Sequence, residues 1–350
     1  MMHHSKLRSA LIGALLALLA ASCSVDKRGQ QQLPNHPIHE SHMSDKPLPG
    51  YVPTGVWRVK GHSGNVVYLA GTCHTVPDNQ LPFPSTYYAA YQQSRDVFFE
   101  IDPDSFAVKF MMFRALPSII SFMISHASEM RSPKGLTLSQ CLSPNTVKLL
   151  RAHYGSMYAS KEHFSPLGLL MDHEFMGDEN PNQGGVDDLF TLLAHRDHKK
   201  ITSLDDQSVV KAINPAMEAF IDEARKNIAQ NGADAAVKEA ILRTDGLTTT
   251  WRYGITDREA AKEFASMRND YPAMYQMLLP QRNNKWIKPI TRAIEGTRTT
   301  TVFVGAAHLP GPDGLLALLR KENYKPEQMY GIDHPRVTNA SAARWPRVGN

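Results

Sequence analysis

Two stretches of the sequence decide the fold: VVYLAGTCH at residues 66–74 and TVFVGAAH at residues 301–308. Each is a run of apolar, β-favouring residues that ends in Gly-x-x-His, so His74 and His308 directly follow predicted strands. In open α/β sheets, ligands bind at the edge where the carboxyl ends of the strands meet. The repeated ending therefore predicts an enzyme with two imidazoles, each able to titrate or to bind a metal, at one edge of its sheet.

A third predicted strand brings carboxylates to the same edge. DVFFEID at residues 96–102 is a compact β-rich run with Glu100 at its carboxyl end and Asp102 on the same face by the two-residue period. Acidic side chains are rarely buried unless they are paired or bound. Together with His74 and His308, Glu100 supplies the ligand types of a catalytic divalent-metal site. The residues leave a second interpretation open, in which two structural histidines accompany an ion-paired Glu100.

The rest of the pattern predicts an α/β fold with a central mixed β-sheet, an N-terminal hairpin and a large helical insertion or cap. VWRVKG and NVVYLAG form the hairpin around the turn HSGN, and KKITSLDD is a further short strand. Gly311, Pro312 and Asp313 predict the start of a helix after the last strand. Further helices are predicted around residues 87–94 and over residues 106–125, 143–155, 186–196, 214–230 and 257–267.

The helix over residues 106–125 is strongly apolar. Lys109, Arg114 and Pro117 interrupt the apolar run, so it does not predict a membrane span. Packing against a core is favoured for its Met and Phe residues over a membrane or peptide contact.

The chain begins with a predicted export signal. Lys6 and Arg8 precede an apolar run over residues 10–21, which is too short to span a membrane. The run ends in LAASC, which resembles a bacterial lipobox whose Cys23 is lipidated; cleavage by an ordinary signal peptidase nearby is the alternative. Because Ser24 rather than aspartate follows the cysteine, we expect a periplasmic lipoprotein anchored in the outer membrane.

Composition divides the remaining chain. The segment after the signal is rich in Gln, Pro, His and Ser and has little to bury, which predicts a flexible linker. Within it His36, His39 and His42 repeat every three residues; we interpret them as part of a solvated linker rather than as a metal store. The C-terminal tail is basic and lacks periodicity. The predicted units are residues 1–23 (signal), 24–49 (linker), 50–333 (folded domain) and 334–350 (basic tail).

Several functional classes are disfavoured by the sequence. The net charge is +4, and no basic stripe with interleaved aromatic residues predicts nucleic acid as a partner. The HExxH zinc-protease motif, the G-x-S-x-G elbow and the phosphate-binding Gly loop are all missing from the sequence. Cys73 lies on the opposite face to Thr72 and His74, so we expect it to pack beneath the site rather than act as a nucleophile. The sequence does not decide whether Cys73 and Cys141 pair.

The chain resembles the TraB/GumN family, whose eukaryotic relatives include the TIKI membrane-tethered proteases. The matching stretches are YLAGTCHTVP, VFFEID, GGVDDLFTLLAHRDHKKITSLDDQ, QRNN and VFVGAAHLPGPDGLLALLRKENY. The resemblance implies a fold similar to the erythromycin esterase and ChaN-like group, with a metal-dependent proteolytic activity. It also implies that His74, Glu100 and His308 form the site and that Arg282 and Asn283 match the Arg-Asn pair of the family.

The leading hypothesis is a secreted, lipid-anchored metallohydrolase that cleaves a peptide or amide bond with the help of Mn, Co or Zn. Glu100 would complete the metal shell or act as general base, with Asp187 in reserve for the other role. Arg282 and Asn283 would stabilise the developing oxyanion. The family commonly has Leu-Glu-Thr before a glutamine, whereas this chain has Asp205 and Asp206, so that carboxylate receives no role. The alternatives are a periplasmic protein that sequesters a peptide or assists an envelope or polysaccharide process, and a haem- or iron-binding protein like ChaN.

Overall fold

The computed structural model describes residues 42–73, 76, 82–102, 106–133, 136–176, 185–206 and 208–333. The predicted export signal, most of the predicted linker, the basic tail and His74 lie outside the described residues. The strands are β1 (Val52–Lys60), β2 (Val66–Thr72), β3 (Asp96–Phe99), β4 (Lys200–Ser203), β5 (Thr300–Gly305) and β6 (Glu327–Gly331).

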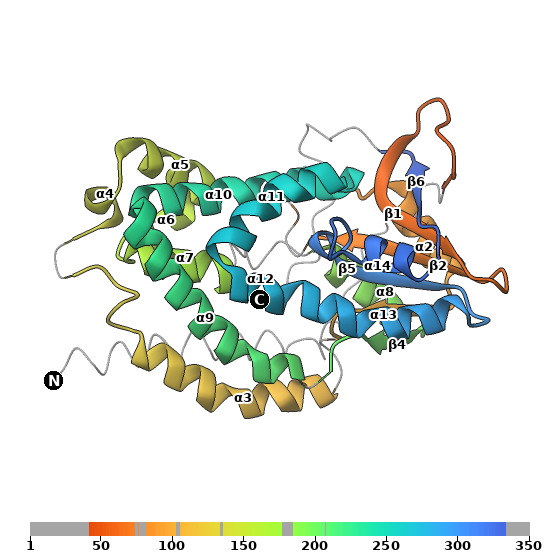
Figure 1. Ribbon diagram of the computed structural model, residues 1–350, viewed down its shortest axis with the longest axis horizontal. Helices are drawn as coiled ribbons and strands as arrows, with labels where there is room; N and C mark the ends of the chain where they lie inside the picture. Colours follow the sequence, from red (N-terminus) through yellow and green to blue (C-terminus); the bar gives the residue numbers. More distant parts are fainter. Residues whose placement is uncertain are drawn as a thin grey trace.

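The strands form one mixed sheet in the order β4-β3-β5-β2-β1-β6 (Figure 1). Strands β4, β3, β5 and β2 are mutually parallel, and β1 is antiparallel to both β2 and β6. The predicted α/β class, the mixed sheet and the N-terminal hairpin β1–β2 are confirmed. The carboxyl ends of four neighbouring strands therefore meet at one edge, which is where the candidate residues were expected.

Helices cover both faces of the sheet. The main helices are α2 (Ser85–Gln93), α3 (Phe106–Ser125), α5 (Pro144–Tyr154), α7 (Pro166–Met171), α8 (Val186–Arg196), α9 (Ser208–Asn231), α10 (Ala233–Thr250), α11 (Asp257–Asp270), α12 (Pro272–Leu278), α13 (Pro280–Ile294) and α14 (Leu315–Lys321), with single turns at α4 (Leu138–Cys141) and α6 (Tyr158–Lys161). A 3-10 turn, η6 (Ala306–His308), follows β5, and Asp172–Met176 form a π-helical turn.

The two faces of the sheet have separate cores because successive strand residues alternate between them. On one face, α13 packs Trp286, Ile290 and Ile294 at helical spacing against strand residues such as Val302, together with α14. On the other face, α2 and α8 bury an aromatic cluster in which the ring of Phe303 stacks on Phe99 and Phe190 at centroid distances of 5.2 and 4.6 Å. Figure 1 draws α13 and α14 in front of the sheet.

A helical lobe with its own core lies beside the sheet (Figure 1). It is built from α3 to α7 and α9 to α12, which lie between β3 and β4 and between β4 and β5 in the chain. Helix α9 begins before the predicted Asn214 and continues through Pro215, and α3 continues through Pro117. Among the described residues, every helix is too short or too polar to cross a bilayer.

The predicted helix start after β5 is wrong by a few residues. Helix α14 begins at Leu315 with Gly314 as its N-cap, and residues 310–314 form a loop instead. The loop is held by Asn283, whose Nδ2 donates to the carbonyl of Asp313 at 2.8 Å, and by Gly311, whose φ of +85° is left-handed.

The cysteines that the structure describes, Cys73 and Cys141, do not form a disulfide. Cys73 is half-buried and packs against the aromatic core under the sheet, as predicted, whereas Cys141 is exposed.

Candidate functional site

The carboxyl ends of the parallel strands bring together residues that are far apart in the chain. Glu100 follows β3, Asp205 follows β4 and His308 lies in the turn after β5. The ladder continues past the strand ends, because the N–H of Asp205 donates to the carbonyl of Glu100 at 2.9 Å. Thr72 at the end of β2 pairs with Gly305 at the end of β5, so His74 follows the neighbouring strand.

Arg282, in the first turn of α13, lies at the centre of this edge. Its Nη2 pairs with Glu100 Oε2 and donates to Asp205 Oδ2 at 2.7 Å, and its Nε donates to the same Asp205 oxygen at 3.1 Å. Its Nη1 lies 3.2 Å from His308 Nε2. The guanidinium also stacks over the Trp286 ring at 4.6 Å from the centroid. One cation thus links both carboxylates with the imidazole.

The electrostatics of this cluster follow from its burial. The Asp205 side chain is only 4% exposed, and burial raises the pKa of its carboxyl above the usual value, although hydrogen bonds from Arg282 and Trp286 pull it down. Burial works to lower the pKa of Arg282, but Glu100 and Asp205 together outweigh it and raise that pKa. Arg282 therefore stays cationic, and Asp205 gains a proton at a higher pH than an ordinary aspartate does.

Asn283 sets the orientation and tautomer of His308. Its Oδ1 lies 2.7 Å from His308 Nδ1, while its Nδ2 donates to the carbonyl of Asp313. Since Oδ1 is an acceptor, this pairing assigns the proton to Nδ1, and Nε2 is the nitrogen that faces Arg282 Nη1. That nitrogen lies 3.6 Å from Glu100 Oε1. Both Asn283 and His308 are buried, so the arrangement is shielded from water.

The two glycines of the Gly-x-x-His boxes allow close approach. The N–H of Gly305 donates to Glu100 Oε1 at 2.6 Å, and a Cβ at Gly305 would lie 3.2 Å from that oxygen. A Cβ at Gly71 would lie 3.2 Å from the Cα of Ala306 and 3.1 Å from Leu309 Cδ1. The first glycine lets β2 approach the turn after β5, and the second lets Glu100 reach the backbone.

The model of the TraB/PrgY/gumN family matches residues 55–328, most of the chain. The chain belongs to the TraB/PrgY/gumN family. No curated protein and no solved structure matches it. The resemblance of the sequence to this family is thereby confirmed.

Two side-chain atoms at the sheet edge, Glu100 Oε1 and His308 Nε2, have about the spacing of two ligands of one metal ion. Ligands at about 2.1 Å from one tetrahedral ion lie about 3.4 Å apart, and Glu100 Oε1 and His308 Nε2 are 3.6 Å apart. The Arg282 cation beside the same nitrogen works against an ion, so the guanidinium would have to move. Within the described ranges, no three His, Cys, Asp or Glu side chains are grouped to hold a metal. A three-ligand site here would need a donor from outside the described residues, and His74 is the candidate that the sequence offers.

Asp187, the reserve candidate, lies at another part of the edge. It is in the first turn of α8, where the N–H of Val186 donates to the carbonyl of Cys73 at 3.0 Å. This hydrogen bond places Asp187 near the end of β2.

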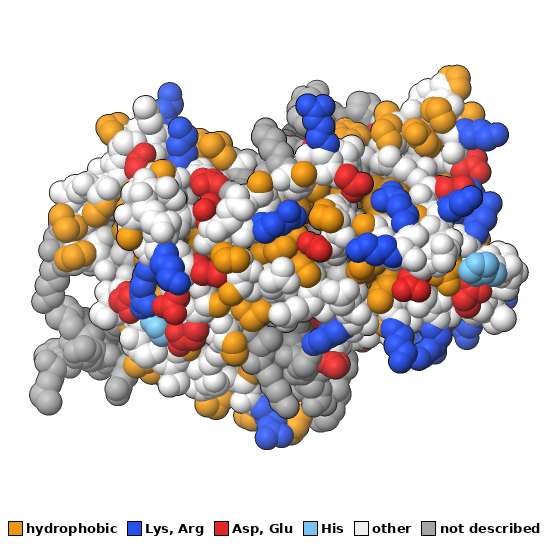
Figure 2. All heavy atoms as spheres, in the orientation of Figure 1, with side chains coloured by type: hydrophobic (Ala, Val, Ile, Leu, Met, Phe, Trp, Pro, Cys, Tyr) orange, Lys and Arg blue, Asp and Glu red, His pale blue; other side chains and the backbone are white. Residues whose placement is uncertain are grey.

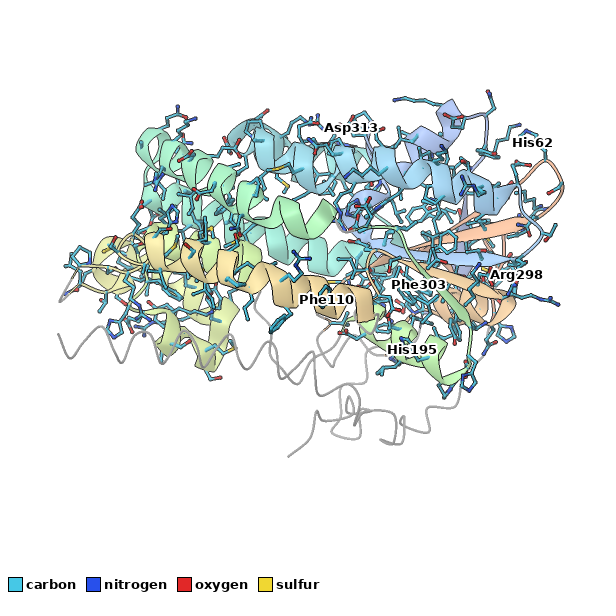
Figure 3. The ribbon with its side chains drawn as sticks, turned by 90° about the horizontal axis from the view of Figure 1, so that it is seen from below. His62, Phe110, His195, Arg298, Phe303 and Asp313 are labelled. Atoms are coloured by element: carbon cyan, nitrogen blue, oxygen red, sulfur yellow. The ribbon has the colours of Figure 1, made fainter. Side chains whose placement is uncertain are left out.

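Asp102 was expected on the face of Glu100 but forms a pair with His195 at 3.4 Å. Strand β3 ends at Phe99, so the two-residue alternation does not continue to Asp102. His195 is exposed near the end of α8; Figure 3 labels it.

Sequence reasoning missed two members of the cluster. Asp205 received no role, yet its carboxylate accepts hydrogen bonds from Arg282 and from Trp286 Nε1, the latter at 2.8 Å. Its position at the end of the predicted short strand KKITSLDD was the available signal. Trp286 follows Arg282 by four residues, so the two share a helix face.

Proposed function

We propose that this protein is a metal-dependent hydrolase that cleaves a peptide or amide bond. The observation that carries the proposal is the pairing of Asn283 Oδ1 with His308 Nδ1, which directs Nε2 of this histidine toward Glu100 and Arg282 at the sheet edge. A metal-binding histidine typically has its other nitrogen held by such a partner. Membership of the TraB/PrgY/gumN family supports the proposal through the resemblance to the TIKI proteases.

The proposed metal ligands are His74, His308 and Glu100, and the ion would be Mn, Co or Zn. When bound, the ion would supply Lewis acidity that polarises the carbonyl of the scissile bond. If Glu100 remains outside the metal shell, its carboxylate can take a proton from the attacking water. Asp187, near the end of β2, is then the candidate for the remaining carboxylate role.

Arg282 and Asn283 have different tasks in this proposal. Arg282 keeps its charge, so it can stabilise negative charge that develops on the substrate oxygen. Asn283 is 1% exposed, and both polar atoms of its amide already have partners. Its Oδ1 pairs with His308, and its Nδ2 donates to the carbonyl of Asp313. We therefore assign Asn283 to positioning His308 and no longer expect it to donate to the oxyanion.

The proposal includes export and anchoring. The apolar run at residues 10–21 and the lipobox-like end at Cys23 support a periplasmic, outer-membrane-anchored lipoprotein. The four parallel strands with polar residues at their carboxyl ends support a fold similar to the erythromycin esterase and ChaN-like group.

A cleavage assay tests the proposed activity. The full chain carrying Cys23→Ala, so that no lipid is attached, would be incubated with a mixed peptide library in the presence of Mn, Co, Zn or a chelator. Mass spectrometry should detect products only when metal is present. His308→Ala should abolish them. His62→Ala is the matched control, because His62 is exposed in the turn at the opposite edge of the sheet (Figure 3).

Two outcomes would contradict the proposal. Cleavage that persists in the presence of the chelator or in His308→Ala would show that the metal or the histidine is dispensable. Saturable peptide binding without cleavage, unchanged by chelation, would favour the sequestering alternative.

A further inference from the structure

The hydroxyl of Thr72, the last residue of β2, is buried without a partner. The side chain is 3% exposed, and within the described part of the chain its Oγ1 forms no hydrogen bond. A buried hydroxyl that makes no hydrogen bond destabilises the fold. Since buried polar atoms nearly always pair with protein or with ordered water, the exception points to contact with a water or ligand, or to a catalytic role.

The other buried threonines that the structure describes in the sheet are all paired. Thr54 and Thr300 each donate to a backbone carbonyl at 3.0 Å. Thr301 Oγ1 lies 2.7 Å from Ser94 Oγ. The strands thus satisfy their hydroxyls where these only support the fold, and Thr72 is the exception.

The position of Thr72 in the sheet directs its side chain toward the candidate site. Thr72 pairs with Gly305 in the parallel ladder of β2 and β5. Partners in this ladder share a face, because the pair two residues earlier, Ala70 and Phe303, lies entirely in the aromatic core (Figure 3 labels Phe303). By the two-residue period, Thr72 and Gly305 face the same side, and their strands lie about 4.8 Å apart.

Gly305 leaves a notch between Thr72 and two residues of the cluster. A Cβ at Gly305 would lie 3.2 Å from Glu100 Oε1 and 3.5 Å from Cδ2 of the His308 ring. Because the glycine has no side chain, the space beyond this position is bordered by the carboxylate and the imidazole on one side and by Thr72 on the other. A glycine at the end of a strand often allows a ligand to approach the backbone closely.

The notch is shielded from bulk solvent. The side chains of His308 and Glu100 are only 5% and 13% exposed. On the face seen in Figure 1, α13 and α14 lie in front of the sheet, and Figure 2 shows in the same orientation that side chains cover it. Hydrogen bonds made in such a place are stronger than in water.

We infer that Thr72 is a further catalytic residue, whose hydroxyl binds the attacking water. The inference rests on the proposed function, with Glu100 as the general base. The water donates one hydrogen to Glu100 and the other to Thr72 Oγ1, which directs a lone pair at the carbonyl carbon. The water oxygen then bonds to this carbon, the C–N bond breaks, and Glu100 passes the proton it took from the water to the leaving nitrogen. Thr72 keeps its own proton throughout.

Thr72→Val tests the inference, because valine has the shape of threonine without the hydroxyl. All proteins would be the full chain with Cys23→Ala, assayed on a peptide that the wild type cleaves. We expect kcat to fall at least about tenfold, with KM and metal content unchanged. Thr72→Val should nevertheless unfold at the same or a higher urea concentration than the wild type, because it removes an unpaired buried hydroxyl. Thr72→Ser keeps the hydroxyl and should keep kcat close to the wild-type value.

Thr301→Val is the matched control. Thr301 is a buried threonine near the start of β5, far along the strand from Gly305, and its hydroxyl is paired with Ser94. Its replacement should have the opposite effects, with a lower urea midpoint and an unchanged kcat.

A crystal structure provides a second readout that needs no substrate. The wild type should show a water within hydrogen-bond distance of both Thr72 Oγ1 and Glu100, and Thr72→Val should lack it.

Several results would overturn the inference. They are an unchanged kcat in Thr72→Val, an equal loss in Thr72→Ser, and a wild-type crystal structure with no water at Thr72 Oγ1. Loss of bound metal in Thr72→Val would assign the hydroxyl to the metal instead of the water. A wild type that cleaves no peptide would refute the proposed hydrolase, and the crystal structure would still decide whether Thr72 and Glu100 share a water.

Discussion

Replacing Arg282 by methionine should destabilise the protein strongly. Methionine keeps an apolar chain against Trp286 but removes the only cation that the described contacts give to both Glu100 and Asp205. The side chains of these acids are 13% and 4% exposed, so they would face each other with little solvent screening. Removing one partner of a buried ion pair costs about 3–5 kcal/mol. We expect a loss of that size in the free energy of unfolding near pH 7.

The loss should shrink as the pH falls. Burial already raises the pKa of Asp205 in the wild type, and Arg282 opposes that rise, so Arg282→Met should raise it further. A carboxyl whose pKa is higher in the folded state binds its proton more tightly there than in the unfolded chain. Lowering the pH through that pKa therefore favours the folded state. The two proteins should differ less at about pH 5 than at about pH 7.

Urea unfolding followed by tryptophan fluorescence measures both effects, since Trp286 is fully buried beside the cluster. Arg225→Met is the matched control: Arg225 is 41% exposed and pairs with Glu129 at the surface, so its loss should cost at most about 1 kcal/mol. The reasoning is refuted if Arg282→Met stays within about 1 kcal/mol of the wild type, or if its deficit is the same at both pH values.

Three further substitutions test the surroundings of the cluster. Asn283→Ala should release His308 and weaken metal binding by about 10–100-fold, measured by calorimetric titration; unchanged affinity would contradict the positioning role. Trp286→Phe removes a hydrogen bond to Asp205 and should raise the pKa of that carboxyl, measured by NMR of the side-chain carbon, at a cost of about 1–3 kcal/mol in stability. Gly305→Ala places a Cβ 3.2 Å from the Glu100 carboxylate and should weaken metal binding without loss of helical content; normal binding would show that the carboxylate tolerates displacement.

The main elements of the fold were predictable because their sequences carry strong local signals. The runs that form β2, β3 and β5 are apolar and end at clear breaks, and parallel strands then place Glu100 and His308 at one edge. Strand β6 was not predicted, since EQMYG is short and polar and depends on pairing with β1. Likewise, the extension of α9 through Pro215 depends on tertiary packing in the lobe.

Three residues of the candidate cluster, Arg282, Asn283 and Asp205, owe their place in it to tertiary contacts that no local sequence pattern predicts. Arg282 and Asn283 lie on a helix about 180 residues after Glu100. Only the resemblance to the family indicated them as site residues, because no spacing in the sequence connects them with Glu100 or His308. Asp205 was visible as an acid after a strand, but only its burial against Arg282 and Trp286 gives it a part in the cluster.

The metal content of the purified full chain tests the central claim most directly. The wild type, His74→Ala, His308→Ala and the control His62→Ala would be offered Mn, Co and Zn, desalted and measured by mass spectrometry. The account predicts about one ion per chain in the wild type and in His62→Ala, and loss of the ion in both other variants. A wild type that retains no ion, or a His308→Ala protein that retains it, would contradict a metal site built from the two histidine boxes.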